Sequence, residues 1–324
     1  MAKYLVTGAG GFIGSNIVHF LIARGAEVRG LDNMSHGRRE NIADILDKFD
    51  FREADVTDSN AVLSACKGMD FVLHQAAVGS VPRSIDDPVG TNESNVSGTL
   101  TVLQAARQTG IKRVVYASSS SVYGDTPTLP KRESMAADPI SPYAVSKYAG
   151  ELYAQTFSKI MGLETVSLRY FNVFGPRQHP SSQYAAVIPK FVRQMLIGEQ
   201  PTIYGDGKQT RDFTFIDNVV SANLLACHAP AERASGRTFN VATGKSYSLN
   251  ELYTILQEAI GFKKPPRYES ARTADVHDSL ADVGPAENAL GYKTLVDFQE
   301  GLRRTVEWYR GELSRAGNSV SALA

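Results

Sequence analysis

The sequence is poor in cysteine, in excess charge of either sign and in long apolar runs, and each shortage excludes a class of protein. Two of the 324 residues are cysteine, Cys66 and Cys227, and they form no CxxC pair, which argues against a disulfide framework or a redox motif. Lys+Arg and Asp+Glu both number 34, which argues against a partner such as nucleic acid or a membrane surface. No apolar run approaches the roughly 18 residues of a membrane span. We therefore expect a cytoplasmic protein with two buried, reduced cysteines.

Metal-ligand spacing and internal repeats are also missing, and we expect no secretory leader. The six histidines are scattered along the chain, so no metal site is expected. What remains is the composition of an ordinary globular protein, with 43% hydrophobic and 21% charged residues. Because 324 residues exceed what one hydrophobic core usually spans, we expect one large domain or two closely joined ones.

The first half of the chain alternates between short apolar runs and amphipathic segments. This rhythm predicts a doubly wound parallel α/β sheet with helices on both faces. The predicted strands are 3–7, 27–31, 51–54, 70–73, 112–117 and 165–169, with 238–241 rejoining the sheet, and the predicted helices are 12–24, 60–66, 92–109 and 143–160. The segment 79–84 between them is predicted to be a loop.

Gly8, Gly11 and Gly14 give a G-x-x-G-x-x-G spacing where the first strand passes into the first helix. Glycine lets the backbone turn sharply and approach a ligand, and a helix N-terminus directs free N–H groups and a positive dipole end at an anion. Strand, glycine turn and helix in this order predict a Rossmann-type site for a dinucleotide pyrophosphate. The alternative is a glycine turn without a ligand.

Asp32 ends the second strand, about 20 residues after the glycines. Its carboxylate is placed to accept hydrogen bonds from the adenosine ribose hydroxyls, and it would repel a 2′-phosphate, which favours NAD over NADP. The nearby Arg38 and Arg39 weaken this preference. The alternative for Asp32 is a residue that starts a loop.

Tyr143 and Lys147 are four residues apart on a predicted helix, so they share one face. An ammonium beside a phenol favours the phenolate and lowers the tyrosine pKa from about 10. The pair therefore predicts a general base with its electrostatic partner, and the alternative is a solvated helix face. The serine run 118–121 ends the fifth strand, where open α/β sheets bind ligands, although serine runs also form local hydrogen bonds.

The second half of the chain lacks clean alternation and predicts a smaller C-terminal substrate-binding lobe interleaved with the sheet. It contains predicted strands at 200–204 and 211–215 and predicted helices at 185–198, 217–228, 248–260 and 297–313. We assign residues 1–176, with 217–244 returning to them, to the dinucleotide-binding domain. Residues 177–216 and 245–315 are assigned to the lobe, and 316–324 to a frayed tail.

Three motifs in one order resemble the extended short-chain dehydrogenase/reductase family: Gly8-x-x-Gly11-x-x-Gly14, Ser119 and Tyr143-x-x-x-Lys147. Within that family, four further segments resemble the UDP-sugar 4-epimerases of the UDP-N-acetylglucosamine and UDP-glucose type. These segments are Arg169 to Pro176, Tyr204 to Gly207, Arg211 to Phe213, and Arg272-x-x-Asp275. The resemblance extends from Lys3 to about Tyr309.

The resemblance implies an isomerase that inverts C4 of a UDP-hexose through a 4-keto intermediate, with NAD tightly bound. Tyr143 would take the proton of the 4-hydroxyl, Ser119 would share that hydrogen bond, and Lys147 would hold the nicotinamide ribose. A homodimer through the helices 92–109 and 143–160 is also implied. The implied cofactor-binding residues are Gly8, Gly11, Phe12, Ile13, Gly14, Asp32, Asn33, Ser35, Gly37, Asp55, Val56, Gln75, Ala76, Ala77, Asn95, Tyr143, Lys147, Tyr170 and Val173.

The same resemblance implies how the UDP-sugar is held. Asn172, Arg211, Arg272 and Asp275 would anchor the UDP, since arginine forms charge-assisted, often bidentate contacts with a pyrophosphate; without the resemblance, surface ion pairs would be the simpler interpretation. The full set of implied substrate-binding residues is Gly79, Ser80, Ser119, Ser120, Ser121, Tyr143, Asn172, Ala186, Val187, Lys190, Tyr204, Arg211, Arg272, Asp275 and Ser279.

Two serines bear on the choice of sugar. Ser121 stands where related dehydratases and decarboxylases carry an acidic residue, which disfavours those reactions. Ser279 stands where epimerases restricted to glucose and galactose carry a bulky tyrosine, and 184–190 resembles the epimerases that prefer N-acetyl-hexosamines. We therefore expect interconversion of UDP-GlcNAc and UDP-GalNAc, with UDP-Glc/UDP-Gal as a second pair. UDP-glucuronate 4-epimerisation and a net NAD(P)-dependent oxidoreductase acting on a nucleotide sugar stay as alternatives.

Overall fold

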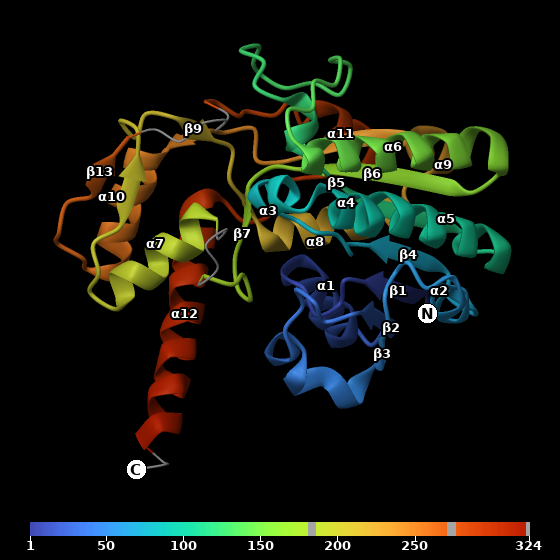
Figure 1. The fold of residues 1–324 in the computed structure, drawn as a ribbon, viewed down its shortest axis with the longest axis horizontal. Coiled ribbons are helices and arrows are strands. Elements are labelled where there is room, and N and C mark those ends of the chain that lie inside the picture. Colours follow the sequence, from blue (N-terminus) through green and yellow to red (C-terminus); the bar gives the residue numbers. More distant parts are fainter. Residues whose placement is uncertain (181–185, 271–276, 322–324) are drawn as a thin grey trace.

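A central parallel sheet of seven strands organises the protein. The computed structural model describes the backbone of residues 1–180, 186–270 and 277–321 (Figure 1). The strands lie in the order β11-β6-β5-β4-β1-β2-β3 and every neighbouring pair is parallel, which confirms the predicted fold class. Their bounds are β1 Lys3–Thr7, β2 Glu27–Asp32, β3 Asp50–Glu53, β4 Phe71–His74, β5 Arg113–Ser119, β6 Glu164–Tyr170 and β11 Arg237–Val241.

Helices cover both faces of this sheet. One face packs against α1 (Phe12–Ala23) and α8 (Ile216–His228), and the other against α2 (Ser59–Cys66), α5 (Gly98–Thr109) and α6 (Pro142–Met161) (Figure 1). Consecutive side chains of a strand point to opposite faces. Leu5 and Val6 of β1 therefore belong to two different buried apolar clusters, so the sheet has a hydrophobic core on each side.

One local prediction in this half was wrong. The segment predicted as a loop at 79–84 contains α3 (Val81–Asp86), because the Ser80 hydroxyl caps its N-terminus, accepting from the Arg83 N–H at 3.4 Å, and Pro82 suits a first turn. The helix predicted at 92–109 is confirmed, but it starts earlier and includes a π-helical turn: α4 (Pro88–Asn92), the π-helical turn (Glu93–Ser97) and α5 follow one another without a break. The shorter helices are 3₁₀ segments at Arg39–Asn41, Ala43–Lys48 and Ser120–Tyr123, with α9 at Ala231–Ala234 and α11 at Gly284–Leu290.

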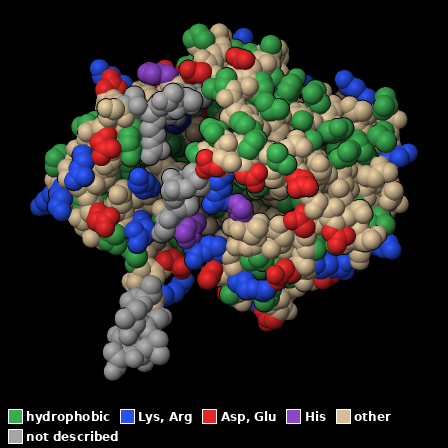
Figure 2. Space-filling view, in the orientation of Figure 1, with side chains coloured by type: hydrophobic (Ala, Val, Ile, Leu, Met, Phe, Trp, Pro, Cys, Tyr) green, Lys and Arg blue, Asp and Glu red, His purple; other side chains and the backbone are tan. Residues whose placement is uncertain are grey.

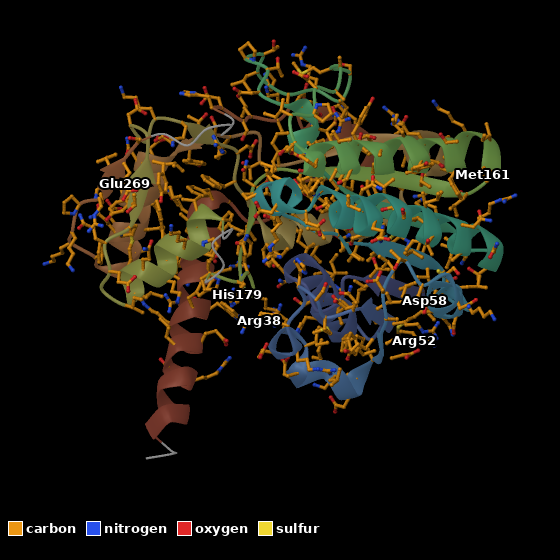
Figure 3. All side chains as sticks on the ribbon, in the orientation of Figure 1. Arg38, Arg52, Asp58, Met161, His179 and Glu269 are labelled. Carbon is orange, nitrogen blue, oxygen red and sulfur yellow. The ribbon has the colours of Figure 1, made fainter. Side chains whose placement is uncertain are left out.

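The C-terminal elements form a separate group beside the sheet, at the left of Figure 1. Figure 3 labels Glu269 in this group and Met161, the last residue of α6, at opposite ends of the molecule. Helix α12 (Phe298–Ser321) leaves the group towards the C-terminus and continues past residue 315. The other elements are α7 Val187–Leu196, β8 Thr202–Tyr204, α10 Leu249–Ile260 and β13 Arg267–Glu269, and the short strands β7 Val173–Phe174, β9 Thr210–Arg211, β10 Thr214–Phe215 and β12 Tyr247–Ser248.

Stacked aromatic rings join this group to the sheet half. The Phe298 ring stacks on Phe213 at a centroid distance of 5.2 Å and on Tyr247 at 4.2 Å. Phe174 meets Phe298 edge to face at 5.8 Å, and each such pair contributes about 0.5–1.5 kcal/mol beyond its buried area. The segment predicted as one strand at 211–215 is two short strands, β9 and β10, with Asp212 and Phe213 between them. The aromatic packing fixes Phe213, two residues after Arg211, against Phe174 and Phe298.

Candidate functional site

The glycine turn after β1 packs so closely that side chains are excluded from it. Gly8 has a left-handed φ of +69°, and its N–H donates to the Leu31 carbonyl at 2.8 Å. A Cβ on Gly14 would lie 2.0 Å from the Gly8 carbonyl oxygen, and a Cβ on Gly8 would lie 2.8 Å from the Ala76 nitrogen. The N-terminus of α1, which follows Gly11, has no side-chain cap. The N–H groups at the start of α1 therefore have no side-chain acceptor, and together with the helix dipole they fit an anionic phosphate group.

A cavity of about 280 Å³ opens beside this turn. Asp32 is 7% exposed on its wall, and its carboxylate accepts the N–H groups of Gly10 at 2.9 Å and Met34 at 2.8 Å. Burial raises the pKa of Asp32, against the effect of these hydrogen bonds. Because each carboxylate oxygen has two lone pairs, the group can still accept bonds from ribose hydroxyls. The predicted residues on this wall are Gly8, Gly11, Phe12, Ile13, Gly14, Asp32, Asn33, Ser35, Gly37, Val56, Gln75, Ala76, Ala77 and Gly79.

The loop after β2 is shaped by hydrogen bonds between the side chains of Asn33, Ser35 and Asp55. The Asn33 amide donates to the Asp55 carboxylate at 2.6 Å, and the Ser35 hydroxyl donates to the Asn33 carbonyl at 2.7 Å. Asn95, in the π-helical turn, accepts the Val78 N–H at 2.7 Å and so shapes the far side of the cavity. Asp55 and Asn95 thus hold the walls in place, while Asn33 and Ser35 also line the cavity.

A second cavity, of about 400 Å³, continues from the first. Phe12, Ile13 and Gly79 line both of them, so the two form one crevice over the carboxyl ends of the strands, the position that open α/β sheets use for ligands. The predicted residues on its wall are Phe12, Ile13, Gly79, Ser119, Ser120, Ser121, Tyr143, Tyr170, Asn172, Val173, Arg211 and Ser279.

Tyr143 stands in this second cavity at the start of α6. The Ser141 hydroxyl caps the helix by accepting the Ala144 N–H at 3.1 Å, and the Tyr143 N–H donates to the Ser84 hydroxyl at 3.0 Å. A hydrogen bond with Ser119 lowers the pKa of Tyr143, but burial raises it by more. The Ser121 hydroxyl donates in turn to the Ser119 hydroxyl at 2.9 Å. Tyr143 and Ser119 are therefore in contact, as a shared proton path requires.

Lys147 lies one helical turn further along and is 4% exposed. Its ammonium donates to the Ala117 carbonyl at 2.9 Å, and burial lowers its pKa to about 7. The predicted lowering of the Tyr143 pKa by this ammonium was wrong, because the pKa of Tyr143 is raised above its ordinary value. Burial accounts for the difference, because it disfavours the charged forms of both side chains.

A buried ion pair, which the sequence analysis missed, lies behind the serine run. Glu151 is fully buried, and its carboxylate accepts two bonds from the Arg169 guanidinium, at 2.8 and 2.7 Å, and one from the Ser118 hydroxyl. The guanidinium also stacks over the Tyr123 ring, 4.6 Å from its centroid. The signal in the sequence was the position of Glu151, four residues after Lys147 and so on the same helix face.

The opposite wall of the second cavity is built by residues far apart in the sequence. Asn172, with a left-handed φ of 36°, donates to the Asp212 carbonyl at 3.1 Å and to the Ser279 hydroxyl at 3.0 Å. Ser279 also accepts the Asp212 N–H at 3.2 Å and is 7% exposed. The Asp212 carboxylate accepts the N–H groups of Thr243, Gly244 and Ala281 at 2.9, 3.0 and 3.2 Å. These bonds fix Ser279 in the cavity wall.

Arg211 lines the second cavity and also a third one of about 240 Å³, whose wall includes Ala186 and Val187. Its guanidinium donates to the carbonyls of Thr210 at 2.9 Å and His277 at 3.0 Å. Arg211 thus marks the point at which the crevice passes from the sheet into the C-terminal group. Arg272 and Asp275, the other two predicted anchors, lie outside the described residues.

Four other predicted site residues make structural contacts. Lys190 and Tyr204 lie together in the C-terminal group, with the ammonium 5.9 Å from the ring centroid, outside the described walls of the three cavities. Ser80 caps α3. The Tyr170 hydroxyl donates to the Gln75 side chain at 3.2 Å, where the two cavities adjoin. The wall of the second cavity also includes Lys131 and Gln178, which are not among the predicted site residues.

The chain is similar in sequence and in fold to known NAD-dependent epimerases. The sequence profile of the NAD dependent epimerase/dehydratase family matches residues 4–242. The UDP-glucose 4-epimerase of Mycolicibacterium smegmatis is 41% identical over 314 residues, which cover 96% of this chain and 99% of that protein. The structure of the UDP-N-acetylglucosamine 4-epimerase of Methanobrevibacter ruminantium in complex with UDP-N-acetylmuramic acid superposes with a TM-score of 0.91 at 39% identity, covering 96% of this chain and 99% of that one. The NAD complex of Thermus thermophilus UDP-glucose 4-epimerase gives a TM-score of 0.86 at 37% identity, with coverages of 95% and 99%.

Proposed function

Because the chain belongs to the NAD-dependent epimerase/dehydratase family, we propose that it is an isomerase that inverts C4 of a UDP-hexose. NAD is the cofactor, and when bound it supplies a reversible hydride acceptor. The observation that carries the proposal is the continuous crevice, in which a phosphate-binding glycine turn at one end adjoins Ser119 and Tyr143 at the other. Gly8, Gly14 and the uncapped N-terminus of α1 would hold the pyrophosphate, and Asp32 the adenosine ribose.

In this proposal Tyr143 exchanges the proton of the sugar 4-hydroxyl, and Ser119 shares that proton through the hydrogen bond between their side chains. Burial raises the pKa of Tyr143, and the hydrogen bond with Ser119 acts against this effect. Lys147, whose pKa burial lowers to about 7, lies one helical turn further along α6 and can change its protonation state near neutral pH. On the substrate side, Asn172 and Arg211 would anchor the UDP, together with Arg272 and Asp275.

The sugar pair that we propose is UDP-GlcNAc and UDP-GalNAc, with UDP-Glc and UDP-Gal as a second pair. Ser279 supports this choice because its small side chain, held by Asn172 and Asp212, leaves room in the cavity wall for an N-acetyl group. The absence of an acidic side chain at Ser121 argues against dehydration and decarboxylation. The similar proteins include both a UDP-N-acetylglucosamine 4-epimerase and a UDP-glucose 4-epimerase, which fits both sugar pairs.

A product assay on a panel of UDP-sugars tests this function. The wild-type protein should interconvert UDP-GlcNAc and UDP-GalNAc without added NAD, because the cofactor is regenerated in each turnover. The Ser279→Tyr variant should lose kcat/KM on UDP-GlcNAc while keeping UDP-Glc turnover, and Ser279→Ala, which opens the same wall, is the matched control. Full activity of Ser279→Tyr on UDP-GlcNAc would refute the choice of sugar. A preference for UDP-glucuronate, or consumption of NAD(P)H with each turnover, would establish one of the two alternatives.

We also propose that the protein forms a homodimer in the cytoplasm. Exposed apolar side chains gather over α4 to α6, at the upper right of Figure 2, and include Val89, Leu100, Val145, Leu152 and Ile160; such a patch is typical of a protein–protein interface. Both cysteines are buried free thiols, which suits a reducing compartment. No helix among the described residues is long and apolar enough to span a membrane. Light scattering should give twice the chain mass, and Val145→Glu should reduce it to the monomer.

A further inference from the structure

Lys131 is a buried cation in the wall of the second cavity, and no part of the proposed mechanism uses it. It is 2% exposed and shares this wall with Gly124, Ser121 and Ser279. Lysine is almost never fully buried unless it is paired. A lysine in this position is therefore expected to have a charged or polar partner for its ammonium.

The backbone of Lys131 is anchored to the segment that carries Ser279. Its N–H donates to the Leu280 carbonyl at 2.7 Å, and its carbonyl accepts the Asp282 N–H at 2.9 Å and the Asn240 amide at 3.0 Å. All three bonds belong to the main chain of Lys131, so a substitution of its side chain leaves them in place. Lys131 and Ser279 are thus on adjacent segments of one cavity wall.

The ammonium of Lys131 is only partly compensated by the protein. It donates to the Thr126 carbonyl, and the carboxylates of Asp125 and Asp278 favour its charged form from a distance. Among the described residues, no carboxylate lies within 4.0 Å of it to form an ion pair. Burial lowers the pKa of Lys131, as expected for an ammonium that has lost water without gaining a close counter-charge.

We propose that Lys131 is a specificity-determining residue whose ammonium donates a hydrogen bond to the carbonyl oxygen of the sugar's 2-acetamido group. This inference rests on the proposed function, in which Ser279 makes room for that group. Lys131 lines the same wall as Ser279, and an ammonium-to-carbonyl bond inside a low-dielectric cavity is stronger than a neutral one. UDP-glucose has a hydroxyl at this carbon, so it gains less from the contact.

The test compares kcat/KM on UDP-GlcNAc and on UDP-glucose in the wild type and in Lys131→Met, which keeps most of the length of the side chain and removes the ammonium. We expect a loss of about 10- to 100-fold on UDP-GlcNAc, chiefly through KM, and a change within about 3-fold on UDP-glucose. Lys131→Arg should restore part of the loss. Lys208→Met is the matched control, because Lys208 is 80% exposed outside the cavity, and it should leave both values unchanged.

Equal losses on both sugars would overturn the inference and make Lys131 a structural residue. A selective loss on UDP-glucuronate would also overturn it, because the acceptor would then be a carboxylate. If Lys131→Met does not fold, the ratio of kcat/KM on UDP-GlcNAc to kcat/KM on UDP-glucose can be measured in Lys131→Arg and Lys131→Gln instead. A wild type that does not turn over UDP-GlcNAc would refute the proposed function alone, and calorimetric binding of UDP-GlcNAc and UDP-glucose to the wild type and Lys131→Met would still test Lys131.

Discussion

The two halves of the crevice are built in different ways. The cofactor half is largely backbone, and its central feature is one short stretch in which Gly14 packs on Gly8 six residues earlier. The sugar half is made of side chains that meet across long sequence separations, such as Asn172 with Ser279, which are 107 residues apart. A local backbone turn is determined by neighbouring residues, whereas a wall of distant side chains depends on the whole fold. Substitutions in the two halves should therefore have separable effects on cofactor binding and on the choice of sugar.

Tyr143 lies in the sugar half of the crevice, and its replacement should have the largest effect. Tyr143→Phe removes the hydroxyl that contacts Ser119 and should lower kcat by about 10²- to 10⁴-fold, the usual contribution of a general acid–base group. NAD should still copurify, because the ring and the start of α6 are unchanged. Tyr153→Phe, on the exposed side of α6, is the control and should turn over normally. A Tyr143→Phe enzyme within tenfold of wild type would remove Tyr143 from the proton path.

Glu151 lies behind the serine run of the sugar half, so its replacement should lower the stability of the fold. Glu151→Gln leaves the buried Arg169 guanidinium without its counter-charge, and removing one member of such a pair costs about 3–5 kcal/mol of folding free energy. Urea unfolding should show this loss. The control is Glu27→Gln, because the Lys3–Glu27 pair is solvent-exposed and exposed pairs contribute little. Equal stabilities of the two variants would show that the buried pair does not hold the serine run.

Gly14→Ala should affect the cofactor half alone. The new Cβ would lie 2.0 Å from the Gly8 carbonyl, so the turn must open, at a cost of about 1–3 kcal/mol. We expect loss of copurified NAD and a lower melting temperature. Gly311→Ala is the control, because a Cβ there meets no atom within 4 Å, and alanine should stabilise a helix by up to about 1 kcal/mol. Retention of NAD by Gly14→Ala would show that the turn tolerates a side chain.

The contrast between the halves also explains how far the sequence could predict the structure. The glycine turn, Asp32 and the parallel sheet follow from local patterns, because adjacent residues determine turns, helix starts and strand ends. Lys131 follows a proline in an irregular loop, and neither periodicity nor spacing links it to Ser279. The resemblance to a known family brought Ser279 and Arg211 to one site, but it gave no reason to include Lys131. The predicted effect of Lys147 on Tyr143 failed because spacing along a helix contains no information on burial.

The titration of Asp212 should have the smallest effect on stability, and this effect should be confined to the sugar half. Its buried carboxylate, which organises the backbone around Ser279, has a pKa raised by burial to about 6, against 3.8 for an ordinary aspartate. The native protein therefore binds this proton more tightly than the unfolded chain does. The stabilisation that proton binding gives the fold is complete below the unfolded-state pKa of 3.8, and it is lost as pH rises through the folded-state pKa of about 6. Compared with Asp212→Asn, which does not titrate, the wild type should be more stable at about pH 5 than at about pH 7.5 by on the order of 1 kcal/mol. Urea midpoints at the two pH values measure this difference. If the difference in stability between the wild type and Asp212→Asn is the same at both pH values, Asp212 titrates outside this range. If Asp212→Asn loses NAD, a substitution in the sugar half also affects the cofactor half.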